Sequence, residues 1–306
     1  MNDLILRGNF HTHTCLCDGV NTPAEVADKA FELGFEILGF SGHMDPDIHM
    51  ELPEYLRAVK QQQDRYEGRM EILCGIELDH FYVEEVFGAD WEGSYVPLCI
   101  KSAEGKTSVD NTDLTEELLA PLDYVIGSSH FIRTGDGTLI PVDYEMEKLS
   151  EGCERYFDGD YYKMAAAYYE QEAQVYTDTH CTFVGHFDLI TRFNDGEHFL
   201  DEEDHRYRDA ALTSMEHLVR QGVPFEINCG AVNRGRKKEF YPNQFLLKNL
   251  KEFGGEIIIN SDAHHMDLLS GAFSEALAAA EAAGFTHVNI LTKKETGKLQ
   301  LQPVEI

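Results

Sequence analysis

The sequence has no apolar run of about 18 residues, the length that a transmembrane helix needs. Its residues 1–10 mix polar and apolar side chains and lack the pattern of a secretory signal peptide. These two absences argue against membrane insertion and against export. We therefore expect a cytoplasmic protein without a membrane partner.

Basic residues are also scarce. The chain has 25 Lys and Arg residues against 55 Asp and Glu residues, which gives a formal net charge of −30. A protein that binds nucleic acid normally presents a basic face, so we expect no nucleic-acid partner. The charge does not exclude a small anionic substrate, because divalent ions held by some of the carboxylates would reverse the sign of the local potential.

Several signatures of covalent or nucleotide chemistry are missing. Four residues separate Cys229 from Arg234, whereas the loop of cysteine-dependent phosphatases needs one more. The sequence has no glycine-rich phosphate loop followed by Lys-Ser/Thr, and no Gly-x-Ser-x-Gly elbow. The seven cysteines are an odd number scattered along the chain, which indicates reduced thiols and not a disulfide framework.

What the sequence does contain is a repeating unit. An apolar stretch rich in Val, Ile and Phe ends in a polar residue, and a segment with helical periodicity follows. Thr22 and Glu25 form the pattern of a capping box at the start of the first such helix. We expect strands that end near residues 11, 43, 77, 130, 186, 228, 262 and 291, and helices over 23–33, 53–66, 161–176, 206–221, 243–253 and 271–283.

This alternation predicts an α/β fold with a parallel sheet, and seven or eight units predict a closed barrel. A chain of 306 residues that is 43% apolar is long enough for one domain, which we expect to span residues 1–306. Residues 87–113 interrupt the rhythm with scattered glycines and weak periodicity. We interpret that segment as an insertion that forms a short β-excursion.

Histidines and carboxylates stand at the ends of the expected strands. His11 and His13 are two residues apart, so on a strand both point to one face, and Asp262 and His264 repeat this spacing. One histidine at a strand end is more often an ordinary polar residue, but a barrel would bring all of these groups to one mouth. The set comprises His11, His13, His43, Glu77, His130, His186, Asp262 and His264.

Imidazoles mixed with carboxylates, without a clear set of thiolates, suit zinc, manganese or iron. The set is larger than one ion needs, so we expect two or three divalent ions. Glu77 and Asp262 are the natural bridging ligands. Arg192 and Arg234 lie in loops at the expected mouth, where guanidinium groups could hold phosphate, while Arg236 and Arg133 are weaker candidates.

In their order along the chain, the motifs resemble those of the PHP (polymerase and histidinol phosphatase) family. They are His11-Thr12-His13-Thr14, Ser41-Gly42-His43, Gly75-Ile76-Glu77, Gly127-Ser128-Ser129-His130, Gly185-His186-Phe187-Asp188 and Asn260-Ser261-Asp262-Ala263-His264. Further stretches, at residues 156–160, 185–190 and 226–228, resemble the histidinol-phosphatase branch. The resemblance implies a distorted TIM-like (β/α)7 barrel with a trinuclear metal site.

Carried over residue by residue, the resemblance implies three ligand groups, of which the first two share Glu77. The first comprises His11, His13, Glu77 and Asp262, the second adds His130 and His186, and the third comprises Asp18, His43 and His264. Asp18 stands in a loop where some family members have a histidine. Glu77, Asp262, Arg192 and Arg234 would carry catalysis.

The implied activity is that of a metal-dependent phosphomonoesterase, a hydrolase of histidine biosynthesis that attacks L-histidinol phosphate with a metal-activated hydroxide. Arg192 and Arg234 would bind phosphate, and Asp143, Glu226 and Asn228 would bind the amino-alcohol leaving group. For Glu226 the simpler interpretation is a buried residue bonded to the backbone, and for either arginine it is a solvated surface residue.

Other functions remain open. The same metal frame could serve a phosphodiesterase or a phosphatase for another small phosphoester, and a PHP domain could also be a non-catalytic metal-binding module. An amidohydrolase-like activity would share the barrel but usually needs another order of ligands. The chain departs from the branch after His130, where only Asp143 matches the expected substrate loop, and at residues 87–113. Both departures concern the choice of substrate.

Overall fold

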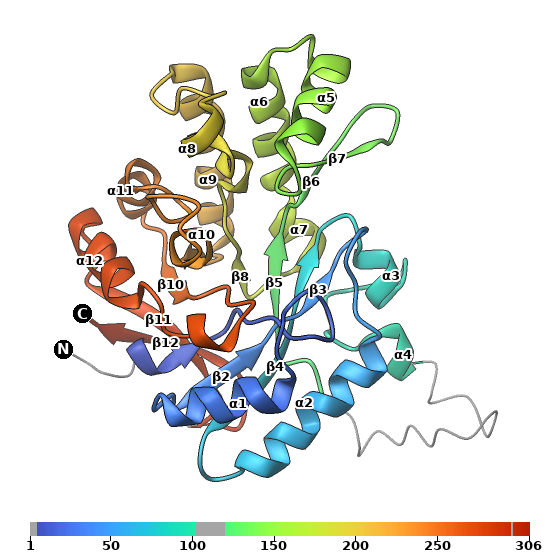
Figure 1. The fold of residues 1–306 in the computed structure, drawn as a ribbon, viewed down its shortest axis with the longest axis vertical. Coiled ribbons are helices and arrows are strands. Elements are labelled where there is room, and N and C mark those ends of the chain that lie inside the picture. Colours follow the sequence, from blue (N-terminus) through green and yellow to red (C-terminus); the bar gives the residue numbers. More distant parts are fainter. Residues whose placement is uncertain (1–4, 102–119, 295) are drawn as a thin grey trace.

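The computed structural model describes residues 5–101, 120–294 and 296–306, and its framework is a mixed β-sheet surrounded by helices (Figure 1). Within these ranges the sheet has ten strands, and neighbouring strands are parallel except for β11 and β12. In chain order they are β1 (Gly8–Asn9), β2 (Ile37–Phe40), β3 (His43–Met44), β4 (Glu71–Asp79), β5 (Tyr124–Ser128), β8 (Phe183–Val184), β9 (Phe225–Asn228), β10 (Ile257–Asn260), β11 (His287–Thr292) and β12 (Gln300–Glu305).

The spatial order of the strands follows the chain almost without a break. The sheet runs β1-β2-β4-β5-β8-β9-β10-β11-β12, and β3 pairs with β4 beyond the end of β2. The segment after β1 also contacts the segment after β10. Thr12 forms a parallel bridge with Ala263, and His13 N–H donates to the Ala263 carbonyl at 2.9 Å. The carboxyl ends of β1 and β10 therefore lie side by side.

Helices cover the sheet because each presents an apolar stripe to it. In α2 (Leu52–Tyr66), the buried Tyr55, Leu56 and Val59 follow helical spacing. The expected capping box is confirmed in α1 (Pro23–Glu32), where Glu25 N–H donates to Thr22 and the Glu25 carboxylate accepts from Thr22 N–H. The other helices that pack along the strands are α6 (Tyr161–Glu172), α7 (Val175–Thr179), α9 (His205–Gln221), α11 (Gln244–Glu252) and α12 (Phe273–Ala283).

The remaining elements are short or belong to loops. They are the helices α3 (Val83–Phe87), α4 (Leu98–Lys101), α5 (Met146–Phe157), α8 (Asn194–Glu197) and α10 (Gly230–Asn233), the 3-10 turns η1 (Ile5–Arg7), η3 (Leu189–Thr191) and η4 (Met266–Leu268), and the hairpin of β6 (Phe131–Arg133) and β7 (Leu139–Pro141). In the described part of the chain, no helix is long and apolar enough to cross a membrane.

Three details differ from the sequence-based expectation. The helix expected over 161–176 is two helices, α6 and α7. The segment after His130 forms the β6–β7 hairpin and α5, which the sequence analysis did not predict and which rise with α6 beyond the end of β5 (Figure 1). Gly152 permits this packing, since a Cβ there would lie 2.6 Å from Ile140 Cγ2. Residues 87–101 form no strand, and residues 102–113 of the expected β-excursion lie outside the described residues.

Tyr124 connects the first four units of the sheet beneath the ends of the strands. Its ring fills the space left by Gly75, where a Cβ would lie 2.3 Å from the ring, and its hydroxyl donates to the Phe10 carbonyl at 2.7 Å and the Phe40 carbonyl at 3.1 Å. Tyr124 is fully buried. It therefore fixes the backbone immediately before His11.

Replacing Tyr124 by Phe removes this buried donor and leaves the ring in place. We expect the free energy of unfolding to fall by about 1–3 kcal/mol, because two buried carbonyls lose a partner. Urea denaturation of Tyr124→Phe checks this, with Tyr144→Phe as the control because Tyr144 is exposed. Equal midpoints for both variants and the parent would contradict the role assigned to the hydroxyl.

Candidate metal centre and substrate pocket

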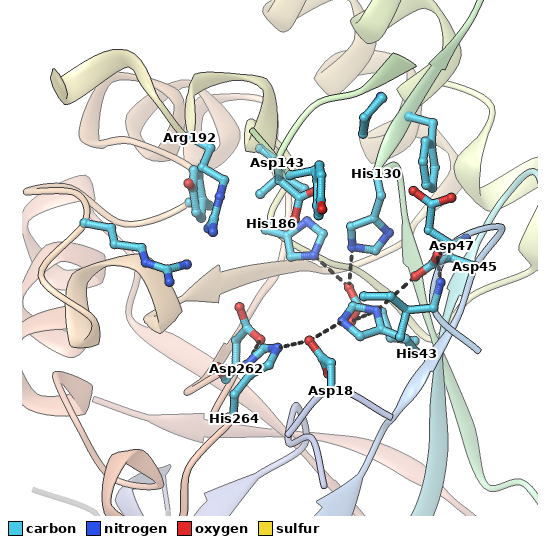
Figure 2. A pocket seen from close by; sticks show the side chains of 18 of the residues that line it. Asp18, His43, Asp45, Asp47, His130, Asp143, His186, Arg192, Asp262 and His264 are labelled. Atoms are coloured by element: carbon cyan, nitrogen blue, oxygen red, sulfur yellow. Dashed lines mark hydrogen bonds and ion pairs between the residues drawn. The ribbon is translucent and has the colours of Figure 1, made fainter. Parts of the chain in front are cut away.

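The carboxyl ends of the strands gather the predicted ligands at one place (Figure 2). His43 opens β3 and Glu77 lies in β4, while the other residues lie in the segments that follow β1, β5, β8 and β10. Four overlapping groups have ligand atoms within 4.8 Å of one another: His13, Asp18, His43 and His264; His11, His13 and Asp262; His11, Glu77 and His186; and His43, Glu77 and His130. All nine predicted positions are therefore brought together.

Glu77 occupies the centre, and its two oxygens face different histidines. Oε1 lies 2.7 Å from His186 Nε2 and 3.2 Å from His130 Nε2. Oε2 lies 3.1 Å from both His11 Nε2 and His43 Nδ1. A carboxylate that links two groups of imidazoles in this way has the arrangement of a bridging ligand.

The Glu77 carboxylate remains ionised in this enclosure. Burial alone would raise its pKa, but the neighbouring His43, His11 and His130 hold the pKa well below its usual range. Ser128 Oγ also donates to Glu77 Oε1 at 2.9 Å, which further favours the charged form.

A second concentration of ligands surrounds Asp18 and Asp262. Asp18 Oδ2 lies 2.9 Å from His264 Nε2 and 3.7 Å from His43 Nε2, and Asp18 Oδ1 lies 3.5 Å from His13 Nδ1. Asp262 Oδ1 lies 3.3 Å from His13 Nε2. The aspartate in the loop after β1 thus takes part in the cluster.

The geometry and charge of the cluster fit divalent cations. His13 Nε2 and His43 Nδ1 are buried and face carboxylates, yet neither makes a hydrogen bond within the described residues. Burial, together with His264 and His43, lowers the pKa of His13 to about 3, so this imidazole is neutral, as a metal ligand must be. Mixed imidazole and carboxylate donors suit zinc, manganese or iron.

The carboxylates around His11 favour added positive charge. Burial alone would lower the pKa of His11, but Glu226, Glu77 and Asp262 raise it well above its ordinary value. His130 behaves in the same way: burial would lower its pKa, but Glu77 and Asp79 raise the pKa above its ordinary value. Carboxylates that raise the pKa of the adjacent imidazoles in this way favour positive charge at the cluster, which suits cations.

Glu226 and Asn228 do not fit the expected contact with substrate. Both are completely buried, and neither lines the pocket. Glu226 accepts from His11 Nδ1 at 2.8 Å, from His186 N–H at 3.1 Å, and from the amides of Asn228 at 2.8 Å and Asn260 at 2.9 Å. In the structure Glu226 therefore orients two candidate ligands and Asn228 donates to Glu226, which for Glu226 favours the simpler interpretation of a buried, hydrogen-bonded residue.

Asp79 has a comparable role that sequence reasoning missed. It follows Glu77 by two residues in β4 and therefore shares its face of the strand. Its Oδ2 accepts from His130 N–H at 2.8 Å. The same spacing that connected His11 with His13 was a usable signal for this residue.

Above the cluster lies a pocket of about 680 Å³. Arg192, Arg234 and Asp143 line it as expected, and so does Arg236, while Arg133 is exposed and packs over the Phe81 ring. Burial, Arg192 and Arg234 lower the pKa of Arg236, as expected for cationic groups that line one pocket. These groups can bind an anion.

Arg234 connects the pocket with the cluster. Its Nη1 donates to the Asp262 carbonyl at 2.9 Å and lies 3.0 Å from His264 Nδ1, and its Nη2 donates to Asp262 Oδ2 at 3.2 Å. One guanidinium therefore orients a candidate ligand and also faces the pocket.

Other residues of the pocket escaped the sequence analysis. Asp45 and Asp47 line it from the loop after β3, and Tyr144 and Tyr241 line it from later loops. The two aspartates follow His43 closely, so their position after a ligating strand was a signal. Tyr241 offered none, because it stands in an irregular segment far from any recognisable motif.

We expect Glu226→Gln to weaken metal binding about 10- to 100-fold, because the amide cannot accept all four hydrogen bonds that hold His11 and His186 in place. Metal content after dialysis against a weak chelator, measured by elemental analysis, checks this. Glu216→Gln on the exposed side of α9 is the control. Equal metal content in Glu226→Gln, Glu216→Gln and the parent would refute the orienting role.

Comparisons with known proteins agree with this arrangement. The family model described as PHP domain matches residues 9–230. A probable histidinol-phosphatase of Deinococcus radiodurans is 26% identical over 302 residues, covering 93% of this chain and 96% of that protein. A histidinol-phosphatase of Bacillus subtilis is 22% identical, with 84% and 92% covered.

A solved structure gives the same fold. The histidinol phosphate phosphatase of Lactococcus lactis, described as complexed with zinc, L-histidinol and phosphate, aligns with a TM-score of 0.60 at 21% identity. The alignment covers 96% of this chain and 98% of that one. The resemblance inferred from the ordered motifs is confirmed, and the chain belongs to the PHP family.

Proposed function

We propose that this protein is a metal-dependent phosphomonoesterase that hydrolyses L-histidinol phosphate to L-histidinol and phosphate. The observation that carries the proposal is the buried cluster around Glu77, which opens into a pocket that three arginines also line. Its relatives in Deinococcus radiodurans and Bacillus subtilis are named as histidinol-phosphatases, and the Lactococcus lactis structure contains that reaction's products.

We propose that the cluster holds two or three divalent ions through its imidazoles and carboxylates. The proposed ligands are His11, His13, Asp18, His43, Glu77, His130, His186, Asp262 and His264. Such ions supply a water activated at neutral pH and offset negative charge on a phosphoryl group. Zinc is the ion named with the Lactococcus lactis protein, and manganese and iron suit the same donors.

Other residues of the chain bind the substrate or orient the ligands. Arg192 and Arg234 bind and orient the phosphoryl group, because guanidinium matches the geometry of paired phosphate oxygens. Asp143, on the same pocket, pairs with the cationic part of the leaving group. Glu226 acts through His11 and His186 and does not touch the substrate.

The architecture carries a related proposal. We infer that the sheet closes as a distorted (β/α)7 barrel and that residues 1–306 form one domain. The bridge between Thr12 and Ala263 supports closure, because it joins the ends of β1 and β10. A cytoplasmic location, a role in histidine biosynthesis and the absence of a nucleic-acid partner stay predictions.

We expect the purified protein to release phosphate from L-histidinol phosphate, to lose this activity after chelation, and to recover it with Mn²⁺ or Zn²⁺. A phosphate-release assay over a panel of phosphomonoesters and phosphodiesters measures it. Turnover of a diester or another monoester without turnover of L-histidinol phosphate would replace the proposed substrate. A metal-replete protein inactive on the whole panel would indicate a non-catalytic module.

We expect Arg192→Ala to raise KM for L-histidinol phosphate about 10- to 100-fold with metal content unchanged, because a charge-assisted hydrogen bond is lost. Steady-state kinetics with elemental analysis checks this. Arg133→Ala is the matched control, since Arg133 lies outside the pocket. Unaltered kinetics in Arg192→Ala would show that phosphate is held elsewhere.

A further inference from the structure

Tyr241 carries a buried hydroxyl group without a hydrogen-bond partner among the described residues. Its side chain is 2% exposed, and it nevertheless lines the pocket above the metal cluster. The backbone is fixed beside β9, because Asn228 N–H donates to the Tyr241 carbonyl at 2.7 Å. The main chain that carries this side chain is thus held by the same strand that carries Glu226.

The other buried tyrosines of the described residues all have partners. Tyr55 donates to the Gly75 carbonyl at 2.6 Å, Tyr124 donates to two carbonyls, and Tyr169 and Tyr207 share a hydrogen bond of 3.0 Å. A buried hydroxyl without a partner is costly, and a native protein that retains one usually uses it for a ligand. Among these tyrosines, Tyr241 alone has a buried hydroxyl without a partner in the described residues, which indicates that it binds a ligand.

The neighbours of Tyr241 indicate which ligand chemistry fits. Arg192, Arg234 and Arg236 line the same pocket, and the Nε atoms of Arg192 and Arg234 are likewise buried without a hydrogen bond. Burial, with Asp188 and Asp143 nearby, raises the pKa of Tyr241 far above its ordinary value although Arg192 and Arg234 oppose the shift. The phenol is therefore neutral and offers an O–H donor next to cationic donors.

We propose that the Tyr241 hydroxyl donates a hydrogen bond to a phosphoryl oxygen and completes an anion subsite with Arg192 and Arg234. A phosphoryl group offers several acceptor oxygens and no carbon surface, so it can satisfy a wall of donors. This inference rests on the proposed phosphatase function and adds a residue to it.

The proposal predicts that Tyr241→Phe weakens phosphate binding but does not lower the thermal stability of the protein. Tyr241→Phe removes a hydroxyl that has no partner among the residues that the structure describes. The described fold therefore loses no hydrogen bond and is relieved of a buried polar group. The bound phosphate, in contrast, loses a donor to a charged acceptor. We expect affinity for inorganic phosphate to fall about tenfold or more while the melting temperature stays equal or rises.

The test is calorimetric titration of the metal-replete full-length protein with inorganic phosphate, together with thermal unfolding without phosphate. Tyr207→Phe is the matched control: it removes an equally buried hydroxyl that does bond within the protein, to Tyr169. We expect this control to melt at a lower temperature and to bind phosphate as the parent does.

Phosphate affinity of Tyr241→Phe within twofold of the parent would overturn the inference. So would a lower melting temperature of Tyr241→Phe, because the hydroxyl would then have a structural partner. If the parent hydrolyses L-histidinol phosphate while either result is obtained, only the role of Tyr241 fails. If the metal-replete parent neither hydrolyses a phosphoester nor binds phosphate, the proposed function fails with it.

Discussion

The structure around the site depends on one buried carboxylate. Glu77 is almost completely inaccessible, and yet imidazoles approach both of its oxygens within hydrogen-bonding distance. A charge in that position is tolerable only when positive or polar groups surround it. The strands on either side of β4 therefore have to end in groups that stabilise Glu77, and this requirement explains why histidines recur at those ends.

A second layer of hydrogen bonds holds the imidazoles at fixed angles. Glu226 connects His11 with the backbone of His186, and Asp79 holds the backbone of His130. These carboxylates are as buried as Glu77. Imidazoles therefore surround Glu77, and further carboxylates hold these imidazoles, at the ends of parallel strands. The pocket is lined by candidate ligands such as Glu77, His43 and His264 as well as by the arginines and Tyr241.

The sequence predicted the inner part of this arrangement well because strand periodicity and strand ends determine where side chains point. Eight of the nine candidate ligands and the helices α1, α2, α6, α9, α11 and α12 follow from such local patterns, whereas Asp18 was indicated only by the family resemblance. For Glu226 the sequence left open whether the side chain contacts substrate or is buried, because strand periodicity specifies a face and not the depth of a side chain. The position of Tyr241 depends on tertiary packing that no local pattern encodes, whereas α5 buries residues at helical spacing that the sequence analysis did not use.

The contact between the ends of β1 and β10 has a consequence for folding. Asn9 donates to Ser261 across 252 residues of sequence, and Thr12 pairs with Ala263. Contacts of such long sequence separation are formed only after most of the loop-closure entropy has been lost. The cluster includes residues from both ends of this span, so no subset of early units can assemble it. The site is therefore assembled only when the ends of β1 and β10 meet.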